Sequence, residues 1–195
     1  MTQVQIHRAI DYVSLPWKKG TGSTKEIARD QGEGLANFGW RLSLADVIES
    51  GDFSTFNSYQ RIITVLEGDG MQLEIDGQQS HPIKQLNPFA FSGDSQVNCQ
   101  LLGSTLRNVN LIYSSQRYQA RLQWLPLQQT QRLFTAANVV LLFNAASTMS
   151  LRLAEQLFTL QNYDCLEYQG NGELLALELV ANTDKPCCLI ELFVR

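Results

Sequence analysis

The sequence predicts an all-β protein, a sandwich or barrel assembled from many short strands. Along most of the chain, apolar residues alternate with polar ones or form short β-branched runs, and clusters of Gly, Asn, Ser or Pro separate these runs. Helical patterns are confined to residues 26–30 and 154–158, which are short and poorly capped and should form single turns at most. Short strands at such close spacing are typical of sandwiches and barrels.

The clearest strand patterns of the first half lie between residues 40 and 75. Residues 40–47 alternate, residues 61–66 form a β-branched apolar run, and residues 71–75 alternate again before an Asp76-Gly77 turn. Two more strands are predicted further along, at 97–102 and 109–113. This half also holds nearly all of the unusual polar residues, so we expect any binding site to lie in it.

The second half shows a similar density of strands. They are predicted at 118–125, 139–143, 164–168, 174–180 and 188–194. We therefore predict two stacked halves, a barrel of residues 1–116 that carries a ligand pocket and a structural barrel of residues 117–195. The two halves show no sequence repeat that is visible by eye.

The composition is that of a compact, mildly acidic protein. The 195 residues include 15 Lys plus Arg and 19 Asp plus Glu, and no block of five like charges, so neither nucleic acid nor an anionic membrane is expected as a partner. The first 20 residues lack an apolar core, and no apolar run approaches the roughly 18 residues of a membrane span. We expect a soluble, cytoplasmic protein, either a monomer or a homodimer.

Cysteine and histidine usage argues against metal chemistry. The four cysteines form no C-x-x-C pair and are expected to be buried thiols: Cys99, Cys165, Cys187 and Cys188. The two histidines, His7 and His81, are too few for a histidine-rich metal site and offer little for a Ser-His-Asp arrangement. We expect no metal and no cofactor.

Two arginines stand in apolar surroundings. Arg61 opens the apolar run 61–66, and Arg41 lies between Trp40 and Leu42. A buried guanidinium keeps its proton, so it needs a carboxylate or carbonyl partner, or it awaits an anionic ligand. If both arginines point into one barrel, they form a receptor suited to a carboxylate. The alternative for each is an ion pair within the protein or a strand end at the solvent.

A loop and a pair of amides are further candidates. Residues 17–24 are Gly-rich and basic but do not match a phosphate-binding loop, so they form either a surface loop or a lid in which Trp17 and Lys18 close over a small anion. Asn108 and Asn110 alternate with apolar residues and share one strand face. Amides that face a barrel interior would orient a polar ligand, whereas amides that face outward would solvate the surface.

Residues 65–77 resemble the core hairpin of cupins, in which one strand ends in V-L-x-G-x-G and the next ends in a D-G turn. Together with other motifs, the chain resembles the HutD/Ves family of double-cupin proteins over nearly its whole length. The motifs are residues 16–27, 40–45, Phe53-Ser54 followed by Arg61, 88–94 and 108–110. The resemblance implies a cupin-like, RmlC-like jelly-roll double barrel.

Metal-binding cupins carry an H-x-H pair and a Glu before the V-L-x-G strand end. Arg61, seven residues before Gly68, stands where that Glu would be, and Ser54 and Phe56 fall near the paired histidines. The resemblance therefore implies a cupin that has replaced its metal with an arginine and binds anions directly. The sequence departs from the usual family pattern in two places: the family usually has Asn where Lys19 stands and Asp where Asn108 stands.

The family resemblance implies a cytoplasmic function tied to histidine degradation in the HutD branch and to stress in the Ves branch. We expect a small-carboxylate-binding protein that modulates histidine utilisation by sensing urocanate, formiminoglutamate or formylglutamate. Arg61 would be the principal anion contact and Arg41 would support it. Secondary hydrogen bonds and closure of the mouth would come from Ser43, Ser54, Asn110, Trp17 and Lys18.

Two other functions remain open at this stage. The first is a metal-independent enzyme that acts on a small organic acid, for which His81, Asp46 and Glu26 are candidate bases. The second is a module that binds an unidentified protein partner through the C-terminal half. We consider a binding protein without enzymatic activity the better-supported expectation.

Overall fold

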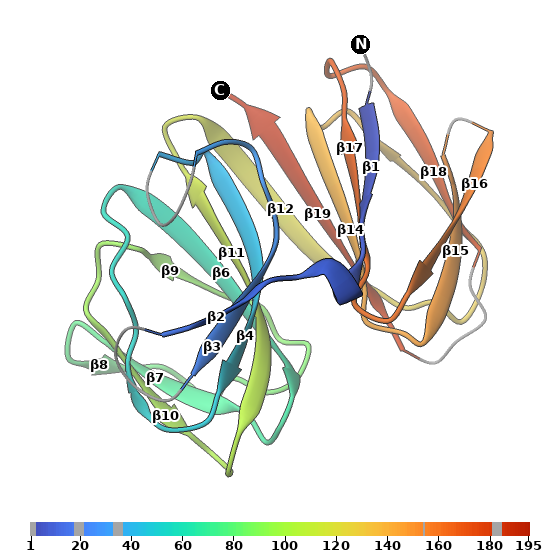
Figure 1. The fold of residues 1–195 in the computed structure, drawn as a ribbon. Coiled ribbons are helices and arrows are strands. Elements are labelled where there is room, and N and C mark those ends of the chain that lie inside the picture. The colour runs from blue at the N-terminus through green and yellow to red at the C-terminus, as the bar shows by residue number, and fades with distance from the viewer. Residues whose placement is uncertain (1–2, 18–21, 33–36, 154, 181–184) are drawn as a thin grey trace. The chain divides into compact units, whose positions relative to one another are not determined.

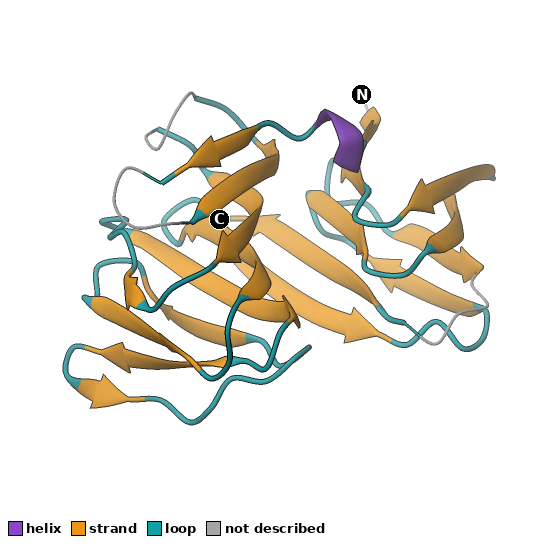
Figure 2. Cartoon of the chain, turned by 60° about the horizontal axis from the view of Figure 1, so that its bottom comes forward, coloured by secondary structure: helices purple, strands orange, loops and turns teal. Residues whose placement is uncertain are grey.

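A computed structural model describes residues 3–17, 22–32, 37–153, 155–180 and 185–195. The chain forms two compact units, Val13–Gln116 and the combination of Met1–Tyr12 with Arg117–Arg195. Regular structure is almost all strand (Figures 1 and 2), and η1 (Ala9–Asp11) is a single 3₁₀ turn. In the part of the chain described, no helix is long and apolar enough to cross a membrane.

The first unit, Val13–Gln116, contains two antiparallel sheets. The six-stranded sheet has the order β2 (Ser14–Pro16), β3 (Ser23–Arg29), β4 (Trp40–Val47), β11 (Leu106–Ser114), β6 (Tyr59–Glu67) and β9 (Phe89–Ser92). The four-stranded sheet has the order β5 (Gly51–Asp52), β10 (Val97–Leu101), β7 (Met71–Ile75) and β8 (Gln78–Gln79).

The second unit also contains a larger and a smaller sheet. The five-stranded sheet has the order β1 (Gln3–His7), β17 (Cys165–Gln169), β14 (Val139–Asn144), β19 (Cys187–Val194) and β12 (Tyr118–Leu125). The four-stranded sheet has the order β13 (Gln131–Thr135), β18 (Leu175–Val180), β15 (Thr148–Leu153) and β16 (Gln156–Gln161).

The strand order repeats between the two units. The arrangement β4-β11-β6-β9 recurs as β12-β19-β14-β17, and β5-β10-β7-β8 recurs as β13-β18-β15-β16. Strands β4 to β11 and strands β12 to β19 are therefore two copies of one eight-stranded jelly roll. The repeat is visible only in the topology, because the two sequences do not align by eye.

In each unit the larger sheet packs against the smaller one. Ile63 and Val65 of β6 share a core cluster with Met71 and Leu73 of β7 in the first unit. In the second unit one core cluster likewise holds Leu142 of the larger sheet together with Met149 and Leu177 of the smaller one. Apolar side chains alternate with polar ones along many of these strands. Because every second side chain points to the same face, the apolar ones gather in the two cores.

The hairpin between β6 and β7 requires glycine at two positions. Gly68 and Gly70 have φ values of +98° and +108°. A Cβ on Gly68 would lie 2.4 Å from the carbonyl oxygen of Thr105, and one on Gly70 would lie 2.5 Å from that of Ile83. The V-L-x-G-x-G spacing thus reflects both backbone conformation and close approach of the neighbouring chain.

Most strand predictions agree with the structure, but the two segments predicted to form single turns at most lie largely in strands. Residues 26–29 belong to β3, where the register shifts at Ile27 between Glu26 and Ala28. This β-bulge places Glu26 and Arg29 on one face, so a helix-like spacing of three occurs in a strand. Residues 156–158 belong to β16, which pairs with β15 after a turn in which Glu155 has a φ of +68°.

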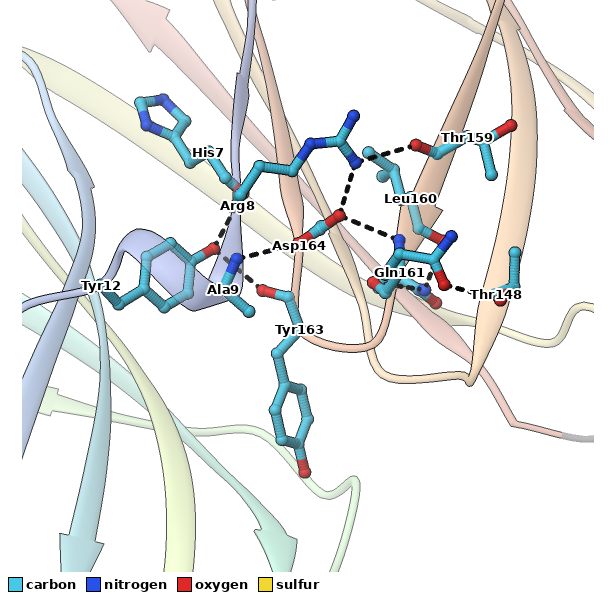
Figure 3. Close-up of polar contacts among 11 residues, drawn as sticks. His7, Arg8, Ala9, Tyr12, Thr148, Thr159, Leu160, Gln161, Tyr163 and Asp164 are labelled. Carbon is cyan, nitrogen blue, oxygen red and sulfur yellow. Dashed lines mark hydrogen bonds and ion pairs between the residues drawn. The ribbon is translucent and has the colours of Figure 1, made fainter.

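Residues 1–12 were predicted to belong to the first barrel, but they belong to the second unit. The reason is that β1 pairs with β17, from Gln3 opposite Gln169 to His7 opposite Cys165. Figure 3 shows the hydrogen bonds that hold the residues after β1 against the second unit. The carboxylate of Asp164 accepts hydrogen bonds from Arg8 Nη1 at 2.7 Å and from the backbone nitrogen of Ala9 at 2.8 Å.

The four cysteines are free and buried, as predicted. Burial raises the pKa of each thiol above its ordinary value, to about 12 for Cys99 and Cys187. The thiols therefore stay protonated at neutral pH and act as small apolar side chains.

Candidate functional site

The larger sheet of the first unit carries a group of polar side chains on its inner face. Residues that lie opposite each other in antiparallel strands point to the same face, so each row across β4, β11, β6 and β9 shares one orientation. Ile63 and Phe91 belong to the core cluster, which identifies their face as the interior. Two interior rows matter here: Arg41, Ile112, Arg61 and Phe91 form one, and Ser43, Asn110, Ile63 and Phe89 form the next.

Arg61 is buried among aromatic rings, with only 7 % of its surface exposed. Its guanidinium carbon lies 4.9 Å, 5.3 Å and 5.5 Å from the ring centroids of Phe91, Phe53 and Phe56. Its Nη1 donates to the backbone oxygen of Ser54 at 3.1 Å, and its Nε is buried without a partner. In the described structure, no carboxylate forms an ion pair with it.

Burial and the nearby positive charge of Arg41 lower the pKa of Arg61 to about 10. The side chain is therefore still a cation at neutral pH. Transfer of a lone charge into a protein interior costs several kcal/mol, and a cation–π contact returns only about 0.5–2 kcal/mol. Arg61 is thus a buried cation, and a bound anion would offset the cost of burying its charge.

Arg41 also faces the interior, but it already has a carboxylate partner. Its Nε donates to Glu26 Oε2 at 2.6 Å, and Arg29 Nε donates to Glu26 Oε1 at 2.6 Å. A second bond runs from Arg29 Nη2 to Glu26 Oε2. Arg41 therefore points into the barrel and forms an ion pair within the protein, which is the alternative to a ligand contact.

Arg29 was not predicted as part of the site, and Glu26 was predicted only as a candidate base, not as the partner of Arg41. Burial by itself raises the pKa of Glu26, but the hydrogen bonds and charges of Arg29 and Arg41 outweigh burial and hold the pKa below its ordinary value. The bulge at Ile27 brings Glu26 and Arg29 to one face, and a strict alternation of period two would have put them on opposite faces. A bulge leaves no reliable signal in a single sequence.

The amides of β11 face the interior as well. Asn108 and Asn110 are buried, and the side-chain oxygen of Asn110 has no hydrogen-bond partner. Ser43 Oγ lies 3.5 Å from the backbone oxygen of Asn110, which is longer than an ordinary O–H···O hydrogen bond and therefore a weak contact. Asn110 and Arg61 thus both present unsatisfied polar atoms inside the same barrel.

The remaining predicted site residues are placed at the edge of this group or beyond the described structure. Ser54 is exposed and offers Arg61 its backbone oxygen, not its hydroxyl. Trp17 packs against the core cluster, and its Nε1 donates to Thr24 Oγ1 at 2.8 Å, so it is held against the barrel. Lys18 lies outside the described residues.

The three candidate bases do not converge on Arg61. Asp46 alternates with Arg41 to the opposite face of β4 and accepts from Arg107 Nε at 2.6 Å. His81 is exposed and lies against the ring of Phe89, with centroids 5.6 Å apart. Glu26 shares the interior face, but both of its oxygens accept from arginines, which weakens it as a base.

Comparison of the sequence with known protein families decides the assignment. The sequence model of the HutD family matches residues 9–189. The chain belongs to the HutD family. An uncharacterized 21.2 kDa protein in the hutC 3′ region of Pseudomonas putida is 55 % identical over 100 % of both chains. The HutD family resemblance inferred from the sequence motifs is thereby confirmed.

Two solved structures share the whole architecture of this HutD family member. A conserved protein of unknown function from Pseudomonas aeruginosa PAO1 is 47 % identical, with a TM-score of 0.96 over 98 % of this chain and 99 % of the other. HutD from Pseudomonas fluorescens SBW25, in a formate condition, is 48 % identical, with a TM-score of 0.86 over 99 % and 100 %.

The predicted cupin fold is also confirmed. A cupin 2 conserved barrel domain protein from Leptotrichia buccalis superposes with a TM-score of 0.56 over 97 % of this chain and 100 % of the other. Its sequence is only 7 % identical, so this likeness concerns the fold alone.

Proposed function

We propose that this protein binds a small carboxylate through Arg61 in its first barrel and modulates histidine utilisation by sensing a pathway intermediate. The observation that carries the proposal is the buried Arg61 cation, which forms no ion pair with a carboxylate in the described structure. Arg41, two strands away in the same row, already binds Glu26 and so is less available to a ligand.

A carboxylate suits this environment in charge and in shape. Guanidinium groups bind carboxylates through two parallel hydrogen bonds, and a hydrogen bond to a charged group contributes about 1.5–3 kcal/mol. The rings of Phe53, Phe56 and Phe91 exclude water around Arg61, which strengthens each electrostatic contact. Asn110 and Ser43 lie in the next row and supply secondary polar contacts.

The choice of ligand rests on the relatives. One relative is described by its place beside hutC, and the family carries the name HutD. Histidine degradation yields small acids, of which urocanate, formiminoglutamate and formylglutamate are our candidates. Formate is the smallest carboxylate probe and is suggested by the formate condition of the Pseudomonas fluorescens structure.

The test is calorimetry at low salt with these four acids on the wild type, Arg61→Met and Arg121→Met. Arg121 is the matched control, because it lies on β12, the counterpart of β4 in the other jelly roll. We expect at least one acid to bind the wild type and Arg121→Met alike, and to bind Arg61→Met at least 100-fold more weakly, which corresponds to about 2.8 kcal/mol. Equal binding to Arg61→Met, or no binding of any of the acids, would overturn the proposal.

A further inference from the structure

On the interior face of the larger sheet, Arg61 and Asn110 each bury a polar atom without a hydrogen-bond partner, and the two atoms are of opposite kind. Arg61 Nε is a donor, and the side-chain oxygen of Asn110 is an acceptor. Buried polar groups are hydrogen-bonded in the great majority of cases, so a pair of exceptions in one place calls for a physical reason. A bound molecule that satisfies both atoms is such a reason.

The strand register places the two residues as diagonal neighbours. On the adjacent strands β6 and β11, Arg61 lies opposite Ile112 and Asn110 lies opposite Ile63. Diagonal neighbours on one face have backbones roughly 7–8 Å apart, within reach of long side chains. One small molecule can therefore meet both groups, provided that its acceptor and its donor are separated by only a few bonds.

We infer that the ligand carries a neutral O–H or N–H donor a few bonds from its carboxylate, and that this donor binds the side-chain oxygen of Asn110. The inference rests on the proposed function, because it assumes that the carboxylate binds Arg61. The donor is neutral because Arg41 and Arg61 share this interior and repel an ammonium group. The ligand class is thus hydroxy acids and amido acids, as opposed to plain alkyl acids or amino acids.

Matched pairs of acids test this inference. Acetate and glycolate differ only by a hydroxyl group, as do propionate and 3-hydroxypropionate, and the two pairs differ in the spacing of the donor. In calorimetry on the wild type we expect the hydroxy acid of at least one pair to bind fivefold or more tightly than its partner. Asn110→Leu should abolish this preference, so that the hydroxy acid binds no more tightly than the plain acid.

The variants separate this inference from the proposed function. Arg61→Met should lose both members of a pair, whereas Asn110→Leu should lose only the preference. If the plain and hydroxy acids bind the wild type equally and Arg61→Met binds neither, the inference fails and the proposed function stands. If no acid depends on Arg61, both fail. If Asn110→Leu does not fold, Asn110→Ala takes its place. A variant at Asn110 that still prefers the hydroxy acid over the plain acid would contradict the inference.

Discussion

The two jelly rolls have the same strand order, yet they differ in the charges that they bury. In the first unit one interior row holds Arg41 and Arg61 on strands β4 and β6. In the second unit a row across the counterpart strands holds Arg121 and Val140 on β12 and β14, with Glu191 on β19 between them. Arg121 Nε donates to Glu191 Oε2 at 2.6 Å, so this row contains its own counter-ion.

The contrast holds for all buried charged side chains of the described residues. Those of the first unit are the arginines Arg41 and Arg61, whereas those of the second unit are the carboxylates Asp164, Glu167 and Glu191. Each of the three carboxylates has a basic partner, from Arg8, His7 and Arg121 respectively. One scaffold thus pairs its buried carboxylates with basic groups in one copy and buries the cation Arg61 without a carboxylate partner, among the described residues, in the other.

The largest loss of stability is expected when the buried carboxylate of Asp164 is removed. Besides Arg8 and Ala9, Asp164 accepts from the backbone nitrogen of Gln161 at 2.9 Å (Figure 3). Asp164→Ala leaves these donors unpaired and should lower the free energy of unfolding by about 3 kcal/mol in urea titrations. Asp94→Ala, which removes an exposed carboxylate of the first unit, is the control. A loss no larger than that of the control would contradict our account of the second unit.

A loss of about 2 kcal/mol is expected for Arg121→Met. The Arg121 side chain is 58 % exposed, but it leaves behind Glu191, a carboxylate with 2 % exposure. The double variant Arg121→Met/Glu191→Leu should recover most of the loss, because no charge then remains buried. Thermal and urea unfolding of the two variants measure this coupling, and additive losses would show that the pair contributes little.

A smaller and pH-dependent effect is expected for Glu26→Gln. Since the pKa of Glu26 is lowered in the folded protein, its contribution is fully present above the pKa of the unfolded chain, about 4.5, and is lost as the pH falls through the lower folded pKa. Glu26→Gln should therefore cost about 1 kcal/mol at pH 7 and progressively less in acid. Urea unfolding of both proteins between pH 7 and pH 3 checks the sign, and a constant difference would contradict it.

The smallest change in stability is expected for Arg61→Met, within about 1 kcal/mol of the wild type. The substitution removes a buried cation and leaves no carboxylate behind, while methionine still packs against Phe53, Phe56 and Phe91. Urea unfolding without ligand gives the comparison with Arg121→Met. A loss above about 2 kcal/mol would make Arg61 a structural residue held by its aromatic neighbours.

Several features of the fold and the site were predictable from local sequence. The predicted strands 40–47, 71–75 and 118–125 coincide with β4, β7 and β12, because alternation and turn residues act over short distances. The burial of Arg61 was predictable because it opens an apolar run. The partners of Arg41 were not, since they depend on a bulge in a neighbouring strand.

The amino-acid sequence alone determined the strand pattern, the glycine hairpin, the family and the presence of a charged residue in an apolar strand. The tertiary structure decided which charges meet: Glu26 with Arg41, Asp164 with Arg8, and none of the described carboxylates with Arg61. It also decided that β1 joins the second unit. The physical reason is that strand pairing and ion pairing join residues far apart in the chain, and a local pattern carries no information about which strand becomes the neighbour.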